Sequence, residues 1–206
     1  MSIEVLFEDD VIIVINKPPD FLSVPGKTER MDVETFIRNK YENLDGPVIV
    51  HRLDMPTSGI MILAKTNETY LELQSQFIKR KVSKRYVALL EGELTENEGE
   101  IELPIRIDLE DRPRQLVCYE YGKHSKTIWK KIEVKDGRTR VHFFPITGRT
   151  HQLRVHAAHL TGLNTPIVGD VLYGKRDNRL HLHAESLTLT HPITKKKIVF
   201  KAPAEF

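Results

Sequence analysis

The sequence has very little cysteine, no long apolar run and no recognisable leader. Its single cysteine, Cys118, excludes an intramolecular disulfide and is typical of a protein in a reducing cytosol. An apolar run such as residues 11–15 is far too short to cross a bilayer. The first five residues lack the basic and apolar regions of a secretory signal. We therefore expect a cytoplasmic protein that does not span a membrane.

Cofactor and metal motifs are also missing. The glycines fit neither the dinucleotide-binding pattern nor a phosphate-binding loop, and no serine-hydrolase elbow is present. His151, His156 and His159 share one predicted helix, but their spacing does not place three imidazoles on one face. His181 and His183 lie on one side of a predicted strand. We therefore predict no metal and no cofactor, and we expect these histidines to be structural or to contact phosphate.

The sequence has no large excess of charge of either sign: 31 basic and 29 acidic residues give a net charge of +2. The two signs are nevertheless segregated. Basic residues gather at 79–85, 123–131 and 195–197, whereas acidic residues gather at 91–100. This segregation is compatible with a phosphate-binding face, and equally with ordinary solvated surfaces.

Strands outnumber helices in the periodicity of the sequence, and short turns join most of them. We therefore predict an α+β fold with a mixed, largely antiparallel sheet flanked by helices and loops. No repeat, linker or composition break divides the chain, so we expect one domain over residues 1–206. The predicted elements are a hairpin of 3–7 and 11–15, a helix after Asp32, strands at 47–50 and 60–64, a helix from Asn67, a strand at 85–90, a hairpin of 127–134 and 139–144, a helix at 147–160, and strands at 180–189 and 198–200.

One acidic residue, Asp54, stands between two of these predicted strands, within turn-forming residues that include Pro56 and Gly59. A turn between two strands can hold a carboxylate in a fixed orientation, as a nucleophile or a charge stabiliser requires. Arg52 places a guanidinium two residues earlier. The alternative is an aspartate that only bonds its own turn backbone.

A second useful charge belongs to the last predicted helix. Its apolar stripe contains Leu153, Ala157 and Leu160, and Arg154 lies about 100° from Leu153, at the edge of the buried face. An arginine placed there can meet a partly buried carboxylate such as Asp54 and keep it ionised. The alternative is an arginine that extends to solvent.

Several separated blocks together resemble the RluA family of RNA pseudouridine synthases, and they cover nearly the whole chain in the same order. The blocks are Asn16-Lys17-Pro18, His51-Arg52-Leu53-Asp54 with Thr57-Ser58-Gly59, Lys84-Arg85-Tyr86, residues 147–156, Gly169-Asp170 with Tyr173-Gly174, Leu182-His183-Ala184 and His191-Pro192.

Two features point to one branch of that family. Many members begin with a small S4-like RNA-binding domain, and this sequence goes directly into the catalytic fold. Residues 112–123 resemble the dual-specificity branch, which modifies a uridine in the tRNA anticodon stem-loop and one in a 23S rRNA hairpin. The resemblance therefore implies RNA partners of these two kinds, no cofactor and a monomer.

The resemblance also implies roles for particular residues. Asp54 is the nucleophile or ribose-stabilising carboxylate, paired with Arg154, and Tyr86 lies under the target base. Arg52 enters the space that the flipped base leaves. The remaining RNA-binding candidates are His51, Lys84, Arg112 and Arg114. From the residues alone, a sheet aromatic packed in the core is the favoured interpretation of Tyr86, and the alternative for Arg52 is an exposed surface charge.

Three other functions remain open from the sequence. The first is a non-catalytic RNA-binding module that uses the same basic face and would tolerate loss of Asp54. The second is a hydrolase that uses Asp54 on the glycosidic bond and releases uracil. The third is a pseudouridine synthase of the same family that acts on another rRNA or tRNA site.

Overall fold

A computed structural model describes residues 3–26 and 31–206, so Met1 and Ser2 of the expected leader-free start lie outside it. The chain divides into two compact units, which are described separately. Unit one contains Met1–Lys84 and Ala184–Glu205, and unit two contains Arg85–His183 with Phe206. The described residues form three α-helices and eleven strands, which agrees with the predicted α+β class. The expectation of one catalytic domain over 1–206 stays a prediction.

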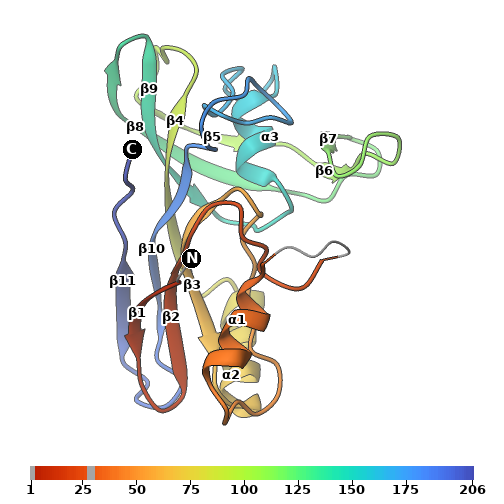
Figure 1. Ribbon diagram of the computed structural model, residues 1–206. Coiled ribbons are helices and arrows are strands. Elements are labelled where there is room, and N and C mark those ends of the chain that lie inside the picture. The colour runs from red at the N-terminus through yellow and green to blue at the C-terminus, as the bar shows by residue number, and fades with distance from the viewer. Residues whose placement is uncertain (1–2, 27–30) are drawn as a thin grey trace. The chain divides into compact units, whose positions relative to one another are not determined.

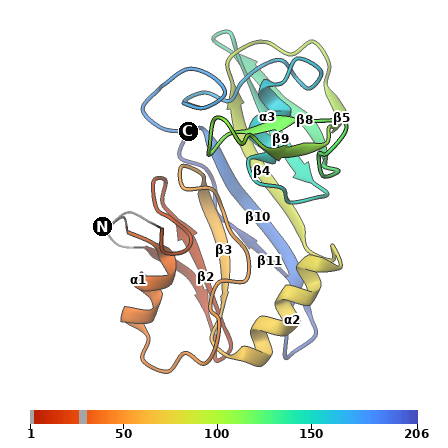
Figure 2. The same cartoon turned by 90° about the vertical axis from the view of Figure 1, so that its right-hand side faces the viewer.

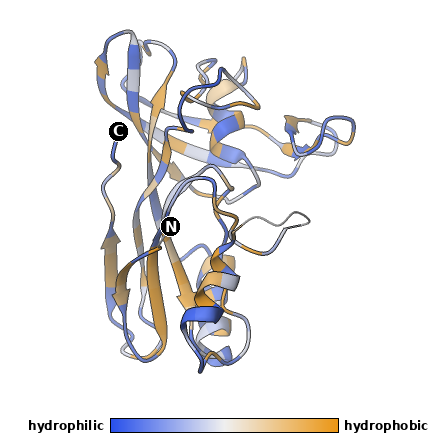
Figure 3. Cartoon of the chain, in the orientation of Figure 1, coloured by the Kyte–Doolittle hydropathy of each residue, from blue (hydrophilic) through white to orange (hydrophobic). Residues whose placement is uncertain are grey.

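Unit one is built on strands in the order β1-β2-β3-β10, with β11 on the far side of β10. Their bounds are β1 Glu4–Glu8, β2 Ile12–Lys17, β3 Ser58–Ala64, β10 Leu182–Thr190, which begins in unit two, and β11 Lys197–Lys201. The pairs β1/β2, β2/β3 and β10/β11 are antiparallel, which confirms the predicted N-terminal hairpin and the predicted tail strands. Apolar residues fill β2 and β3 without alternation because both faces of these strands are buried (Figure 3).

Two helices lie beside these strands (Figure 1). Helix α1 spans Val33–Lys40, and the side chain of its N-cap residue, Asp32, accepts a hydrogen bond from the Thr35 amide. Helix α2 spans Asn67–Ile78 and is capped in the same way by Thr66. Leu73 of α2 is fully buried in the unit-one core. Helix α1 therefore begins after its predicted cap, and α2 begins at Asn67 as predicted.

The predicted strand at residues 47–50 is wrong. Only one isolated bridge forms there, between Ile49 and Leu63. The Ala64 amide of β3 donates to the Val48 carbonyl, but the Ile62 amide donates to the ring of His51 rather than to backbone, so the pairing does not extend into a strand. The apolar residues of this segment, such as Val48, are still buried, which explains the misleading pattern.

Unit two contains strands in the order β4-β9-β8-β5, and the pairs β4/β9, β9/β8 and β8/β5 are antiparallel. The bounds are β4 Ser83–Leu90, whose first two residues belong to unit one, β5 Glu98–Glu102, β8 Lys126–Lys135 and β9 Arg138–Pro145. Asp136 and Gly137 both have positive φ, at 52° and 73°, as a two-residue hairpin turn requires. The predicted hairpin is confirmed, whereas β5 was not predicted.

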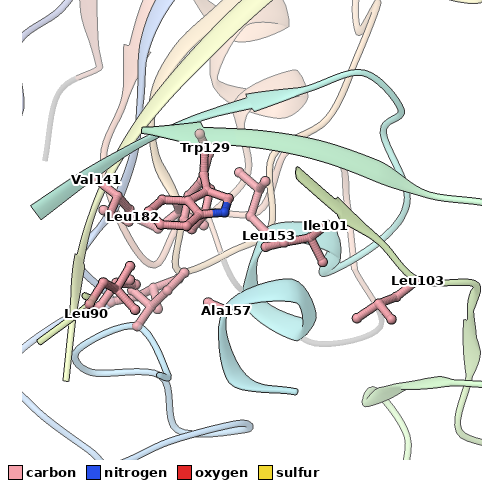
Figure 4. Packing of buried hydrophobic residues seen from close by; sticks show 13 residues of the cluster. Leu90, Ile101, Leu103, Trp129, Val141, Leu153, Ala157 and Leu182 are labelled. Carbon is pink, nitrogen blue, oxygen red and sulfur yellow. The ribbon is translucent and has the colours of Figure 1, made fainter. Parts of the chain in front are cut away.

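A small two-stranded ribbon projects from the rest of unit two in Figure 1, and the side of the molecule that carries it faces the viewer in Figure 2. It consists of β6 Ile105–Ile107 and β7 Gln115–Val117, and neither strand was predicted. The unit-two core contains Trp129 of β8, and Val117 of β7 packs against it. In Figure 4, Leu153 and Ala157 of helix α3 belong to this core.

Helix α3 spans Gln152–Ala158 and is shorter at both ends than the predicted helix. The Gln152 side chain accepts hydrogen bonds from the Thr147 hydroxyl and the Arg149 amide, which holds the preceding segment in a loop. His151 has φ 53°, a left-handed conformation that a helix cannot include. Leu160 lies beyond the helix end and is 75% exposed, so its predicted place in the core is wrong.

Among the described residues, no helix is both long enough and apolar enough to cross a membrane.

Candidate active site

Asp54 begins a tight turn that is held by main-chain and side-chain hydrogen bonds. The Thr57 amide donates to the Asp54 carbonyl at 3.0 Å, which closes the turn. Just before it, the buried Ser23 hydroxyl donates to the Leu53 carbonyl at 2.7 Å and accepts from the Leu53 amide at 3.1 Å. The backbone on both sides of Asp54 is therefore fixed, and its side chain is half-buried. This confirms the predicted turn.

Lys17 supports the same turn from the end of β2. Its side chain is fully buried, and its ammonium donates to the carbonyls of Pro18, Phe21 and Met55 at 2.9, 2.8 and 2.9 Å. Such hydrogen bonds from a charged donor are stronger than neutral ones. Because Met55 directly follows Asp54, Lys17 links the end of β2 to the turn that carries the acid. The sequence indicated Lys17 only as part of a family block and gave no sign of this role.

His51 anchors the segment that leads into the turn. Its Nε2 accepts the Ile62 amide hydrogen bond at 3.1 Å, and its ring stacks on Phe77 of α2 at 4.7 Å. Burial, and secondarily the charge of Lys84, lowers the pKa of His51 to about 3. His51 is therefore neutral near pH 7, and because Nε2 is the acceptor, its proton is on Nδ1. The structure gives His51 a positioning role, while its predicted contact with RNA stays a prediction.

Two basic residues near His51 differ in exposure. Arg52 is exposed, as a residue that reaches toward a substrate needs to be. Lys84 is half-buried, and its pKa is lowered first by burial and then by the charge of Arg80. A cation that is poorly solvated in the free protein gains more from a phosphate partner than a fully hydrated one does. Their roles toward RNA stay predictions.

Tyr86 lies on β4 in unit two, opposite Phe143 of β9. It is half-buried and packs against the edge of the unit-two core. The strand prediction is therefore confirmed. An aromatic ring with one part packed and one part accessible fits either of its two interpretations, a core side chain or a surface on which a base stacks.

Arg154 is buried rather than at the edge of the buried face, with 2% of its side chain exposed. It forms a bidentate salt bridge with Asp170, with Nε–Oδ2 at 2.8 Å and Nη2–Oδ1 at 2.7 Å. Oδ1 of Asp170 also accepts the amides of Leu172 and Tyr173. Within unit two, the carboxylate that Arg154 meets is therefore Asp170. The pairing of Arg154 with Asp54 stays a prediction.

The other two RNA-binding candidates belong to the β6–β7 ribbon of unit two. Arg112 is exposed in the connection between the two strands. Arg114 directly precedes β7, and its Nε forms an ion pair with Asp111 at 2.9 Å. The ribbon thus presents two guanidinium groups near its turn, in keeping with the predicted contacts to an RNA backbone.

The histidines do not form a metal site in the described part of the chain, where no three His, Cys, Asp or Glu residues are placed to hold an ion. His156 is structural: its Nε2 is 2.9 Å from the Ser125 hydroxyl, and burial lowers its pKa to about 4. His151 contacts Tyr173, and the ring of His181 lies against Phe206.

Each unit therefore brings separate segments together. In unit one, residues 17–23 and 51–57 form the support of Asp54. In unit two, α3, Asp170 and Tyr173 surround Arg154. The sequence indicated Lys17, Asp170 and Tyr173 only as members of family blocks, without a supporting role, and it did not indicate Ser23 at all. The available signals were a lysine at the end of an apolar strand, Lys17, and an aspartate after a glycine, Asp170.

Comparison with known proteins gives consistent results. A family model described as RNA pseudouridylate synthase matches residues 11–159. The chain is 44% identical over 210 residues to the dual-specificity RNA pseudouridine synthase RluA of Escherichia coli (strain K12), which covers 98% of this chain and 93% of that protein. The protein of the same name from Haemophilus ducreyi is 43% identical over 215 residues, with 99% and 94% covered.

Two solved human structures show the same fold. RNA Pseudouridylate Synthase Domain Containing 1 aligns with a TM-score of 0.81 and 28% identity over 100% of this chain and 84% of that chain. RNA Pseudouridylate Synthase Domain Containing 4 aligns with a TM-score of 0.78 and 23% identity over 97% and 88%. The predicted fold class is confirmed by these two structures.

Proposed function

Because the chain belongs to the RNA pseudouridylate synthase family, we propose that it converts uridine to pseudouridine in structured RNA. The substrates proposed are a tRNA anticodon stem-loop and a 23S rRNA hairpin, since the relatives that match 98–99% of the chain are named dual-specificity enzymes. The main structural support for this reaction is the turn at Asp54. This turn is held by hydrogen bonds from Ser23 and Lys17 and by its own closing hydrogen bond.

The reaction breaks the glycosidic C–N bond of uridine and joins the same base to the ribose through carbon. It is an isomerisation, so no group is supplied or lost. The proposed role of Asp54 is to act on the base or on the sugar, or to assist elimination through a glycal, and a fixed carboxylate serves each of these routes. Support comes from the rigid backbone around Asp54, which orients the acid before the substrate binds.

Tyr86 and Arg154 are the other proposed participants. The proposed role of Tyr86 is to stack on the target base and to move a proton, and its half-buried ring on β4 supports this. The proposed role of Arg154 is to keep Asp54 ionised and oriented. Its rigid attachment to Asp170 supports this role, because a guanidinium with two of its donors fixed presents its remaining donors in one direction.

The uridine must leave the stack of its stem-loop before it can react, at a cost of a few kcal/mol. We assign the replacement of the flipped base to Arg52, which is exposed two residues before Asp54. Lys84, Arg112 and Arg114 are proposed to contact the RNA backbone, and His51 is proposed to contact the RNA beside Arg52. A cytoplasmic monomer without cofactor is proposed on the same family resemblance.

One assay tests this function against the alternatives. The protein is incubated with each of the two stem-loops, and the nucleosides are then analysed by mass spectrometry with a chemical tag specific for pseudouridine. The tag is needed because the isomer has the same mass as uridine. Tagged product is expected from both RNAs. Free uracil would indicate a hydrolase, unchanged uridine with bound RNA a binding module, and product from only one RNA a narrower specificity.

A further inference from the structure

Tyr173 joins three separate segments of unit two. Its hydroxyl accepts a hydrogen bond from the Gln115 amide at 2.7 Å and lies 2.8 Å from Nδ1 of His151. Its ring lies against the Arg154 guanidinium, whose Cζ is 5.2 Å from the ring centroid. The side chain is half-buried, so one residue connects the ribbon, the start of α3 and the buried arginine.

The first connection reaches the β6–β7 ribbon. Gln115 is the first residue of β7, and each strand of the ribbon has only three residues. A two-stranded ribbon of this size is marginally stable without further support. The hydrogen bond to Tyr173 ties it to the rest of unit two directly beside Arg114, whose Cζ is 6.0 Å from the same ring.

The second connection reaches Arg154. The Tyr173 amide donates to Oδ1 of Asp170 at 3.2 Å, and the same oxygen accepts from Nη2 of Arg154 at 2.7 Å. His151, which contacts the Tyr173 hydroxyl, directly precedes α3, and Arg154 lies in the first turn of that helix. Because the hydroxyl already accepts the Gln115 amide proton, its own proton is available for Nδ1 of His151.

We propose that Tyr173 is a positioning residue, which fixes the RNA-contacting ribbon relative to Arg154 by means of its hydroxyl. RNA that Arg112 and Arg114 hold is then presented to the reacting groups in one register. The inference rests on the proposed function, since it assigns these arginines to RNA and Arg154 to the reaction. It separates two roles of one side chain: the hydroxyl orders the ribbon, and the ring packs on Arg154.

The test uses two substitutions at Tyr173. Tyr173→Phe keeps the ring and removes the hydroxyl, so the Gln115 amide loses its acceptor. We expect hydrogen exchange of that amide to become about tenfold faster and KM for the stem-loop to rise about fivefold, with kcat within about twofold of the wild-type value. Tyr173→Leu also removes the ring from Arg154, so kcat should fall at least tenfold in addition.

The matched control is Tyr41→Phe, which removes a tyrosine hydroxyl that donates to Glu8 at 2.7 Å in unit one. It should leave both KM and the Gln115 exchange rate unchanged. The inference is overturned if Tyr173→Phe leaves the Gln115 amide equally protected, or if it lowers kcat without changing KM. Wild-type protein that forms no pseudouridine would refute the proposed function. Normal wild-type chemistry with an unchanged KM in Tyr173→Phe would refute only the role of Tyr173.

Discussion

Replacing Lys17 by methionine should damage the reaction without touching any group proposed to contact RNA. Methionine has nearly the length of lysine but cannot donate a hydrogen bond. The substitution therefore leaves the carbonyls of Pro18, Phe21 and Met55 without the ammonium that they share. The Met55 carbonyl is the one that matters for function, because it belongs to the turn that begins at Asp54.

The expected cost can be worked from these three contacts. A buried acceptor that loses its partner costs about 1–3 kcal/mol, and the lower end applies here because the methionine removes a buried charge at the same time. Three carbonyls then give a loss of about 3 kcal/mol in the free energy of unfolding. A domain with an ordinary stability of about 5–15 kcal/mol stays folded after such a loss. If the turn shifts by about 1 Å, the rate should fall up to about 100-fold.

Urea unfolding and pseudouridine formation under single-turnover conditions measure the two effects. Lys65→Met is the matched control. Like Lys17, Lys65 donates hydrogen bonds from its ammonium, here to the Glu8 carboxylate and the Asp9 carbonyl, but none of them reaches the Asp54 turn. The control variant should lower stability with little change in rate. If Lys17→Met reacts at the wild-type rate and RNA affinity is also unchanged, Lys17 does not position Asp54.

Three further predictions concern unit one. Arg52→Ala should slow the reaction at least tenfold on a stem-loop and much less on a short unstructured RNA, and equal rates on both would exclude a role in flipping. The pKa of His51 is lowered to about 3, so its stabilising contribution is complete above about pH 6.5 and is lost as the pH falls toward 3. His51→Gln should therefore show a weaker fall in unfolding free energy over that range, and identical pH curves would contradict the neutral, buried ring. Gly59→Ala should abolish soluble expression, because the added Cβ would lie 2.4 Å from the Ala184 carbonyl oxygen at φ 115°, and a stable, active variant would show that the strands can separate.

Local signals in the sequence predicted much of the fold. The N-cap Asp32 and the turn pair Asp136-Gly137 act on their own neighbours, and the structure confirms both. The strand prediction at residues 47–50 was wrong because strand formation depends on partners that are distant in the chain. A buried apolar run has the same pattern whether or not its backbone joins a sheet, and here only a single bridge to β3 forms before the His51 ring accepts the Ile62 amide.

The support of the candidate site was harder to predict because its contacts are distant in the chain. The Met55 carbonyl that Lys17 binds is 38 residues away, and Ser23 meets Leu53 across 30 residues. Periodicity carries no information at such separations. Arg154 shows the same limit: its position on the helix indicated a buried edge and a carboxylate partner, but Asp170 could be identified only from the folded chain.

The proposed function requires that Asp54 performs the isomerisation and does not merely complete a turn. The most direct measurement is pseudouridine formation by Asp54→Asn on the tRNA anticodon stem-loop, compared with wild-type protein and accompanied by RNA affinity under the same conditions. No tagged product above background is expected from the variant, with an RNA affinity close to that of the wild type. Substantial product from Asp54→Asn would contradict the proposed function.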